Sequence, residues 1–326
     1  MKPRVALALV VGPFTWAAAC TLDGLDAYTS GDGGAIAIDG GGKDALVLDG
    51  PVTADAPGDA PSAPCNLAAP FGAPAPLASL NTTRLEGQAA LSPDERTVYF
   101  ESDRLNKGSN VFTASRASRA AAFGAPAPLD SLNFMGADTW NAALTADALT
   151  AYVTTDQCAC PEGRMYKMTR ASTLASFGNQ TVMPGAIAKG AQPYVLPDGT
   201  VLYYSDLTTG PKGFIARAVL GANPTPVKVD LVGPGAHDVG IPVVTPDERT
   251  LYFAVFDANG PFDYDVWVAT RASANDPWGT AQPVGELNTK QFEAPSWVSP
   301  DGCRLYFTRV MDEAGSNWDL FVTSKP

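Results

Sequence analysis

Acidic side chains recur in this sequence at one kind of position, at the start of short runs that resemble β-strands. Two carboxyl groups on either side of a sugar can hydrolyse a glycosidic bond, one as the acid and the other as the base or nucleophile. Polar residues that cap solvated loops would give the same pattern. Recurrence across repeats, instead of one special place, favours that second interpretation. The positions are Glu86, Asp138, Asp238 and Glu293, with Lys189 in a fifth run.

Aromatic residues on the same runs could add binding chemistry. Trp140, Tyr194 and Trp297 could stack on a sugar at the mouth of a channel, although we favour a role in packing the channel itself. Together with the acidic residues they define one candidate ligand site, which consists of Glu86, Asp138, Trp140, Asp238, Glu293 and Trp297.

Other catalytic arrangements find little support. His237 is the only histidine, so a histidine metal cluster is excluded, and nothing places a nucleophile near it for a Ser-His-Asp triad. The segment "DANGPFDYD" (257–265) spaces oxygen ligands around a glycine but lacks EF-hand spacing, so we interpret it as a polar hairpin loop. No glycine-rich phosphate loop follows a strand. We therefore assign no catalytic residue, no metal and no cofactor.

A turn-and-strand unit that occurs five times must position these side chains. "LSPDERTVYF", which ends at Phe100, is typical, and the unit recurs every 49 to 54 residues. Its shared Asp falls at Asp94, Asp147, Asp198, Asp247 and Asp301. A Tyr follows five residues later each time, at Tyr99, Tyr152, Tyr203, Tyr252 and Tyr306, and we expect this series in the core. A fixed period near 50 with short β-type runs predicts a propeller.

The outermost element of each unit is a proline-containing phrase. "FGAPAPLASLN" (71–81) and "FGAPAPLDSLN" (123–133) differ at one position. Proline suits an outer edge strand, which can do without some ladder hydrogen bonds. The first copy has no unit before it, and the chain ends after the third strand of the fifth unit. We therefore predict an all-β, five-bladed β-propeller over residues 65–326, whose last blade is completed by the N-terminal strand.

The repeat resembles the TolB-type, WD40-like propeller repeat of bacterial envelope proteins. The matching residues are the (S/T)PD(G/E)xxLYF cores, "SDR" at 102–104 and "YDVWVATR" at 264–271. TolB has six blades and an extra N-terminal domain, so the resemblance implies the fold and not the role of TolB. Five-bladed glycoside hydrolases place catalytic carboxylates at positions comparable to those of the acidic residues above.

The cysteines provide a test of ring closure. Cys65 leads into the closing strand, and Cys303 lies in the turn between the first two strands of blade five, at the same end of the ring. We predict a disulfide between them. Cys158 and Cys160, in the loop after the second strand of blade two, would form a local bridge or remain free thiols.

The N-terminus has the pattern of an export signal. Lys2 and Arg4 precede an apolar stretch that ends in three alanines and Cys20. This arrangement resembles a bacterial lipoprotein signal over residues 1–20, with Cys20 as the lipidated residue. Ordinary secretion with an incidental cysteine is the alternative. Leu22 after Thr21 favours, by the same resemblance, the outer membrane.

Residues 21–64 should be a disordered tether. This segment is rich in Gly, Ala, Asp and Pro, has a single aromatic residue, and carries eight Asp against one Lys. It cannot bury enough apolar surface to offset the entropy of ordering. The net charge of the whole chain, −12, also argues against nucleic-acid partners.

These features favour an exported, monomeric lipoprotein of the cell envelope with a non-catalytic propeller. The propeller would present the face opposite the Pro-Asp turns to a protein partner, or to a glycan. The alternatives are an envelope glycoside hydrolase that uses two of the acidic residues, and a calcium-stabilised scaffold.

Overall fold

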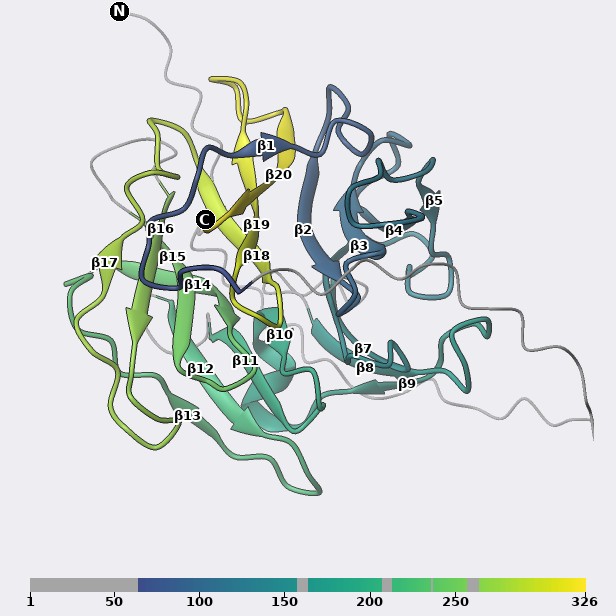
Figure 1. Ribbon diagram of the computed structural model, residues 1–326. Helices are drawn as coiled ribbons and strands as arrows, with labels where there is room; N and C mark the ends of the chain where they lie inside the picture. The colour runs from purple at the N-terminus through teal and green to yellow at the C-terminus, as the bar shows by residue number, and fades with distance from the viewer. Residues whose placement is uncertain (1–63, 157–163, 207–212, 236, 257–263) are drawn as a thin grey trace, which may run out of the picture. The chain divides into compact units, whose positions relative to one another are not determined.

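The computed structural model describes residues 64–156, 164–206, 213–235, 237–256 and 264–326 (Figure 1). The predicted signal segment with Cys20, nearly all of the predicted tether, and Cys158 and Cys160 lie outside the described residues, as does most of the segment 257–265. Among the residues described, no helix is long and apolar enough to cross a membrane.

The described strands form five antiparallel four-stranded sheets. Blade one contains β2 (Glu86–Leu91), β3 (Thr97–Ser102), β4 (Asn110–Ser115) and β5 (Ala127–Pro128). Blade two contains β6 (Thr139–Leu144), β7 (Thr150–Thr155), β8 (Arg164–Thr169) and β9 (Gly178–Val182). Blade three contains β10 (Ala191–Val195), β11 (Val201–Asp206), β12 (Phe214–Val219) and β13 (Pro226–Lys228), after a short 3-10 helix, η1 (Gly185–Lys189). Blade four contains β14 (Asp238–Val244), β15 (Thr250–Phe256), β16 (Tyr264–Thr270) and β17 (Gln282–Pro283). Blade five contains β18 (Glu293–Val298), β19 (Arg304–Val310), β20 (Trp318–Ser324) and β1 (Ala75–Pro76).

The inner strands close a ring. Each of β2, β6, β10 and β14 contacts the inner strand of the next blade, and β18 contacts β2 (Figure 1). The five-bladed propeller predicted from the repeats is therefore confirmed. We call the end of the ring with the Pro-Asp turns the turn face, and the end where the inner strands begin the opposite face.

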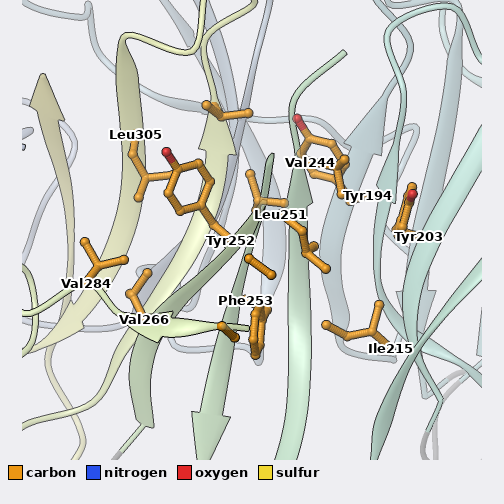
Figure 2. Close-up of a cluster of buried hydrophobic side chains, with 14 of the residues drawn as sticks. Tyr194, Tyr203, Ile215, Val244, Leu251, Tyr252, Phe253, Val266, Val284 and Leu305 are labelled. Atoms are coloured by element: carbon orange, nitrogen blue, oxygen red, sulfur yellow. The ribbon is translucent and has the colours of Figure 1, made fainter. Parts of the chain in front are cut away.

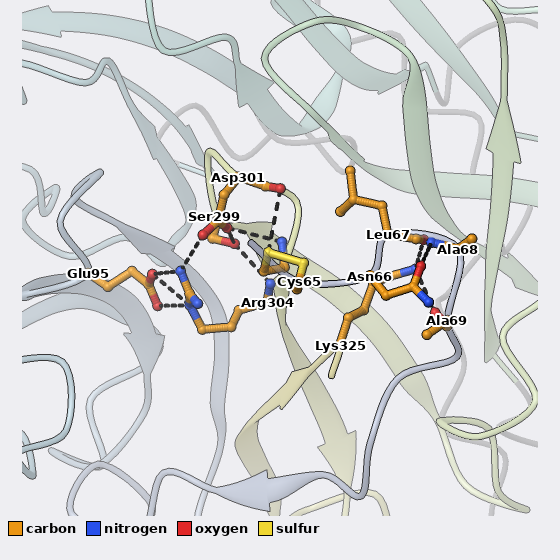
Figure 3. The surroundings of a disulfide bond; sticks show 11 residues. Cys65, Asn66, Leu67, Ala68, Ala69, Glu95, Ser299, Asp301, Arg304 and Lys325 are labelled. Carbon is orange, nitrogen blue, oxygen red and sulfur yellow. Dashed lines mark hydrogen bonds and ion pairs between the residues drawn. A yellow bond between two sulfur atoms is a disulfide. The ribbon is translucent and has the colours of Figure 1, made fainter. Parts of the chain in front are cut away.

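Blade five is closed by the N-terminal strand, as predicted. β1 pairs antiparallel with β20, with Ala75 opposite Val322. A disulfide joins Cys65 to Cys303, with 5.8 Å between the Cα atoms (Figure 3). Two distant parts of the sequence are thus held together at the turn face by strand pairing and by a covalent bond.

The repeated phrase has the same contacts in both copies. The Gly72 amide donates to the Ser324 carbonyl as the Gly124 amide donates to the Ser115 carbonyl, each at 2.8 Å. The leucines of the phrase, Leu80 and Leu132, are completely buried. The near identity therefore reflects one structural position that is filled twice.

The repeated tyrosines lie in the core between blades, as expected. Each is at most 6% exposed: Tyr99, Tyr152, Tyr203, Tyr252 and Tyr306. Figure 2 shows Tyr203 and Tyr252 among the buried side chains that fill the space between neighbouring sheets. These aromatic and β-branched residues pack well on pleated sheets, which explains why "LYF" runs form the second strands.

Candidate functional site

The central channel is narrow toward the turn face. The cavity there, which the Pro-Asp turns and the inner strands line, measures about 40 Å³, which is room for one or a few waters and not for a sugar. Tyr194 and Trp297 line it, and the Trp297 ring packs edge-on against Tyr306 with 5.7 Å between centroids. The Trp297 ring therefore contributes to the packing of the ring centre, which is the role that the sequence favoured, and its place in a ligand site stays a prediction.

Glu86 is inside the protein and fully engaged. Its carboxylate accepts the Thr82 amide at 2.6 Å and the Ser102 hydroxyl at 2.8 Å, and Arg104 lies 3.4 Å away. The side chain is 0% exposed. It therefore fixes the loop before β2, which agrees with the loop-capping role that the recurrence favoured.

Glu293 has the same role in blade five. Its carboxylate accepts the Thr289 hydroxyl at 2.6 Å and the Arg309 Nε at 2.8 Å, and it is also 0% exposed. Burial raises the pKa of Glu293, while the hydrogen bonds from Thr289 and Arg309 lower it. Glu86 and Glu293 are therefore each bound to an arginine of their own blade.

Asp138 and Asp238 are only half-buried, and so is Trp140. Asp138 accepts the Ser109 amide at 2.8 Å, and its own amide donates to Asp156 at 2.7 Å. Burial, followed by the charges of Asp156 and Asp103, raises the pKa of Asp138, although the bond from Ser109 opposes the shift. One carboxylate oxygen of Asp238 is buried without a hydrogen bond. Within the described residues, therefore, the candidate acids remain in different blades.

Each inner strand has a register irregularity beside the channel, and four of them carry a residue with positive φ there. The irregularity directs an amide toward the preceding blade, where a side chain of the second strand accepts it. The Ile241 amide donates to Ser205 at 2.9 Å, and the Gln88 amide donates to Thr308 at 3.2 Å. In these two blades the acceptor is a small hydroxyl two residues after the repeated Tyr, whereas the hydroxyl of Thr154 at the same position is buried without a hydrogen-bond partner.

Glu101 takes that acceptor position in blade one and was missed in the sequence. The equivalent residues elsewhere are Thr154, Ser205, Ala254 and Thr308. Glu101 is 9% exposed and has hydrogen bonds from Ser109 and from the Asn141 amide. Burial, aided by the charge of Asp138, raises the pKa of Glu101 to about 7. The available signal was that a carboxylate stands where the repeat has a hydroxyl or a methyl.

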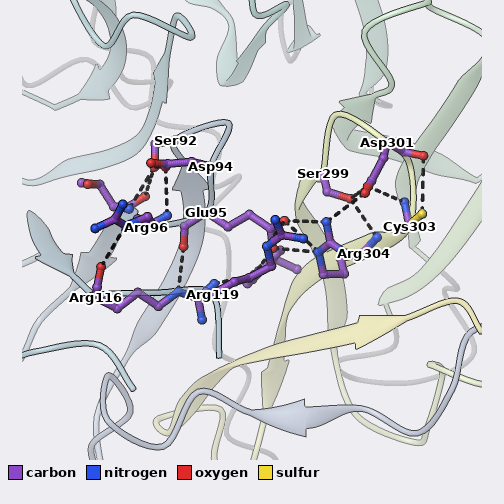
Figure 4. A network of polar contacts seen from close by, with 12 residues as sticks. Ser92, Asp94, Glu95, Arg96, Arg116, Arg119, Ser299, Asp301, Cys303 and Arg304 are labelled. Atoms are coloured by element: carbon purple, nitrogen blue, oxygen red, sulfur yellow. Dashed lines mark hydrogen bonds and ion pairs between the residues drawn. The ribbon is translucent and has the colours of Figure 1, made fainter. Parts of the chain in front are cut away.

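The turn face carries two further buried carboxylates, at the left-handed position of the Pro-Asp turns. Glu95 has φ 60° and accepts from Arg304 at 2.7 Å and from the Tyr306 hydroxyl at 2.7 Å, both from the preceding blade (Figure 4). Glu248 has φ 54° and accepts from Arg217 at 2.6 Å and from the Tyr203 hydroxyl at 2.5 Å. These networks join neighbouring blades.

A larger pocket lies between blades four and five at the turn face. Its volume is about 390 Å³, and the segment after Cys65 contributes Leu67 and Phe71 to its wall. Tyr252, Glu286 and Lys325 also line it. No sequence pattern predicted this pocket, because it is created by residues from both ends of the chain.

No family model matches the sequence, and no curated protein is significantly similar to it. Among solved structures, TolB from Acinetobacter baumannii is 16% identical over 64% of this chain, with a TM-score of 0.42, and the chain spans 44% of that protein's length. A GH62 alpha-L-arabinofuranosidase catalytic domain from Coprinopsis cinerea is 13% identical over 78% of this chain and 96% of its own, with a TM-score of 0.47. An alpha-L-arabinofuranosidase from Podospora anserina is 14% identical over 77% of this chain and 95% of its own, with a TM-score of 0.45. These similarities concern the fold alone. The TM-scores are all below 0.5, so the five-bladed propeller fold rests on the sheet topology above.

Proposed function

We propose that this chain is an envelope lipoprotein whose propeller binds a protein partner through the opposite face and performs no catalysis. The narrow channel is the observation that carries the proposal, because the cavity of about 40 Å³ toward its turn face leaves no room for a sugar there. The engagement of Glu86 and Glu293 with their own arginines supports it as well.

Loops of the opposite face supply apolar contact groups. Met135 is 99% exposed, and Leu105 and Met311 are about half exposed, on loops of blades one and five. Methionine is adaptable and common at binding surfaces. A partner that covers these side chains would bury apolar area, which is the main driving force of protein association.

A photo-reactive residue introduced at Met135 tests this surface in cells. We expect one cross-linked partner band that is absent when the same residue is introduced at Leu174, which is 97% exposed on the turn face. Equal labelling from both positions would contradict the assignment of the face. The membrane attachment is tested separately by radiolabelled palmitate, which should enter the wild type and not Cys20→Ala.

A glycan is the second candidate ligand, favoured by one observation. Glu101 and Asp138 both contact Ser109, and both carboxyl groups have a raised pKa, which is a frequent property of functional sites. A panel of aryl glycosides should show no turnover with the wild type under the protein-binding proposal. Turnover that disappears in an Asp138→Asn, Glu293→Gln double variant, or in Glu101→Gln, would establish the hydrolase instead.

A further inference from the structure

The pocket between blades four and five lies at a junction without the inter-blade glutamate network that two other junctions have. At the junctions of blades five and one, and of blades three and four, a turn glutamate accepts the hydroxyl of the tyrosine on the preceding blade. At the junction of blades four and five, Gly302 occupies the equivalent turn position, with φ 72°. Tyr252 therefore meets no glutamate from the next blade.

A second departure from the repeat widens the same space. In blades one, two and four, an arginine directly follows the third strand. Its Nε donates to the backbone carbonyl of the Pro-Asp turn in the same blade, as Arg271 does to the Glu248 carbonyl at 2.6 Å. In blade five the residue is Lys325. Its Nζ instead donates to the carbonyls of Leu67 at 2.6 Å and Ala69 at 3.0 Å. The result is the pocket of about 390 Å³, a size that fits a small ligand.

A tyrosine contributes to the wall of the pocket. Tyr252 is 4% exposed, and no hydrogen bond of its hydroxyl occurs between the residues that the structure describes. Burial, and after it the charge of Glu286, raises the pKa of Tyr252 to about 12, which places the two groups near each other. Because Tyr252 lines the pocket, its hydroxyl can bond to a ligand there.

The charges of the lining favour a cation. Asp247, Glu286 and Asp301 line the pocket, and the single ammonium in the lining, that of Lys325, is already bound by two carbonyls and lies over the Phe71 ring. Asp301 is paired with Arg304 at 3.0 Å, whereas Glu286 accepts the Phe71 amide at 2.9 Å and its charge also acts on Lys325. The Tyr252 ring, 5.9 Å from the Phe71 ring, offers aromatic surface on which a further cation could bind.

We propose that this pocket binds an ammonium or guanidinium group on an apolar stem, with Glu286 and the Tyr252 hydroxyl as its polar partners. The stem would lie against the apolar wall, which includes Val268 and Val284. A lysine or arginine side chain of another protein and a free amine share this chemistry. The inference does not depend on the proposed function, since a cation site can exist on a propeller with any partner.

Calorimetric titration of the full chain with n-butylammonium, N-acetyl-lysine amide and butyrate tests the proposal. The two cations should bind, and butyrate should not. Tighter binding of the lysine derivative would identify a protein side chain as the source, and tighter binding of the simple cation would identify a free amine. Glu286→Gln should weaken both cations about tenfold or more, because a charge-assisted hydrogen bond is lost.

A second variant gives blade five the turn glutamate of blades one and four. Glu95 and Glu248 occupy this turn position with a positive φ, as Gly302 does, so Gly302→Glu is compatible with the backbone. The added Cβ would meet only the flexible end of Leu67 at 3.2 Å and Thr245 at 3.9 Å. It should abolish binding without loss of folding. Gly199→Glu, at the equivalent turn of blade three, is the matched control and should bind normally. Absence of binding to the wild type, equal binding of butyrate, or binding that survives both Gly302→Glu and Glu286→Gln would overturn the proposal.

Discussion

The Lys325 ammonium lies 4.8 Å from the centroid of the Phe71 ring, so that residues from the two ends of the chain form one cation–π pair. The same pair occurs in three other blades between residues close in sequence. The equivalents are Arg116 over Phe123 at 4.4 Å, Arg170 over Phe177 at 4.3 Å and Arg271 over Trp278 at 4.1 Å. The ring therefore closes by reusing the contact that attaches each outer strand to its blade.

The asparagine that ends the repeated phrase should be important for that attachment. The Asn81 side chain donates to the Leu320 carbonyl at 3.1 Å and accepts the Leu320 amide at 2.9 Å. Asn133 has the same two bonds with Val111. Asn81→Ala and Asn133→Ala should each lower the free energy of unfolding by about 1–3 kcal/mol, because strand backbone groups lose their partners. Urea unfolding measures both, and a change in only one would contradict their equivalence.

The disulfide should stabilise the closed ring considerably. It joins residues 238 positions apart, and cross-links across long loops remove much entropy from the unfolded chain. Cys65→Ser with Cys303→Ser should lower the free energy of unfolding by about 3–5 kcal/mol. Reductant should have the same effect on the wild type and none on this double variant. Peptide mapping that links Cys65 to Cys158 or Cys160 would refute the pairing.

The fold could be predicted because each unit carries its own local signals. The Pro-Asp turn and the Tyr five residues later mark every blade, and the phrase from Phe71 to Asn81 marks the closing strand. Counting these elements was sufficient, since sheet pairing within a blade joins strands close in sequence. Only the closure needed an argument about distant segments, and the extra copy of the phrase provided it.

The candidate site was harder to predict from the sequence, because the position of a residue along a strand does not determine its burial. Glu86 and Glu293 begin inner strands, but their arginines come from the second strand or the loop after it, at Arg104 and Arg309. A Thr four residues before each glutamate was the local sign of a structural bond. Departures from the repeat, at Glu101 and Gly302, would have indicated unusual sites better than recurrence did.

The turn glutamates should be costly to remove. Glu95→Ala leaves the Tyr306 hydroxyl without its carboxylate and Arg304 with Asp301, at 3.0 Å, as an ion-pair partner. Ala148 stands at the same turn position of blade two with φ 55°, so alanine itself tolerates the backbone. The free energy of unfolding should therefore fall by about 1–3 kcal/mol, because the buried hydroxyl and the arginine each lose a hydrogen bond. A loss below about 1 kcal/mol in urea unfolding would show that the network contributes little.

Glu101 should make stability fall as the pH rises. Burial raises its pKa in the folded state to about 7, against an ordinary value of 4.5, so the folded protein binds this proton more tightly than the unfolded chain does. The favourable contribution is complete below pH 4.5 and is lost as the pH rises through 7. The total loss is roughly 3 kcal/mol at 1.36 kcal/mol per pKa unit.

Glu101→Thr isolates this effect, because Thr154 and Thr308 occupy the same position in other blades. The difference in free energy of unfolding between the variant and the wild type should increase between pH 5 and pH 7.5, since every other titrating group is common to both proteins. The variant should be relatively more stable at the higher pH, where the wild type must hold a buried carboxylate near Asp138 and Asp103. Parallel pH profiles would mean that Glu101 ionises in the folded state as easily as in the unfolded chain.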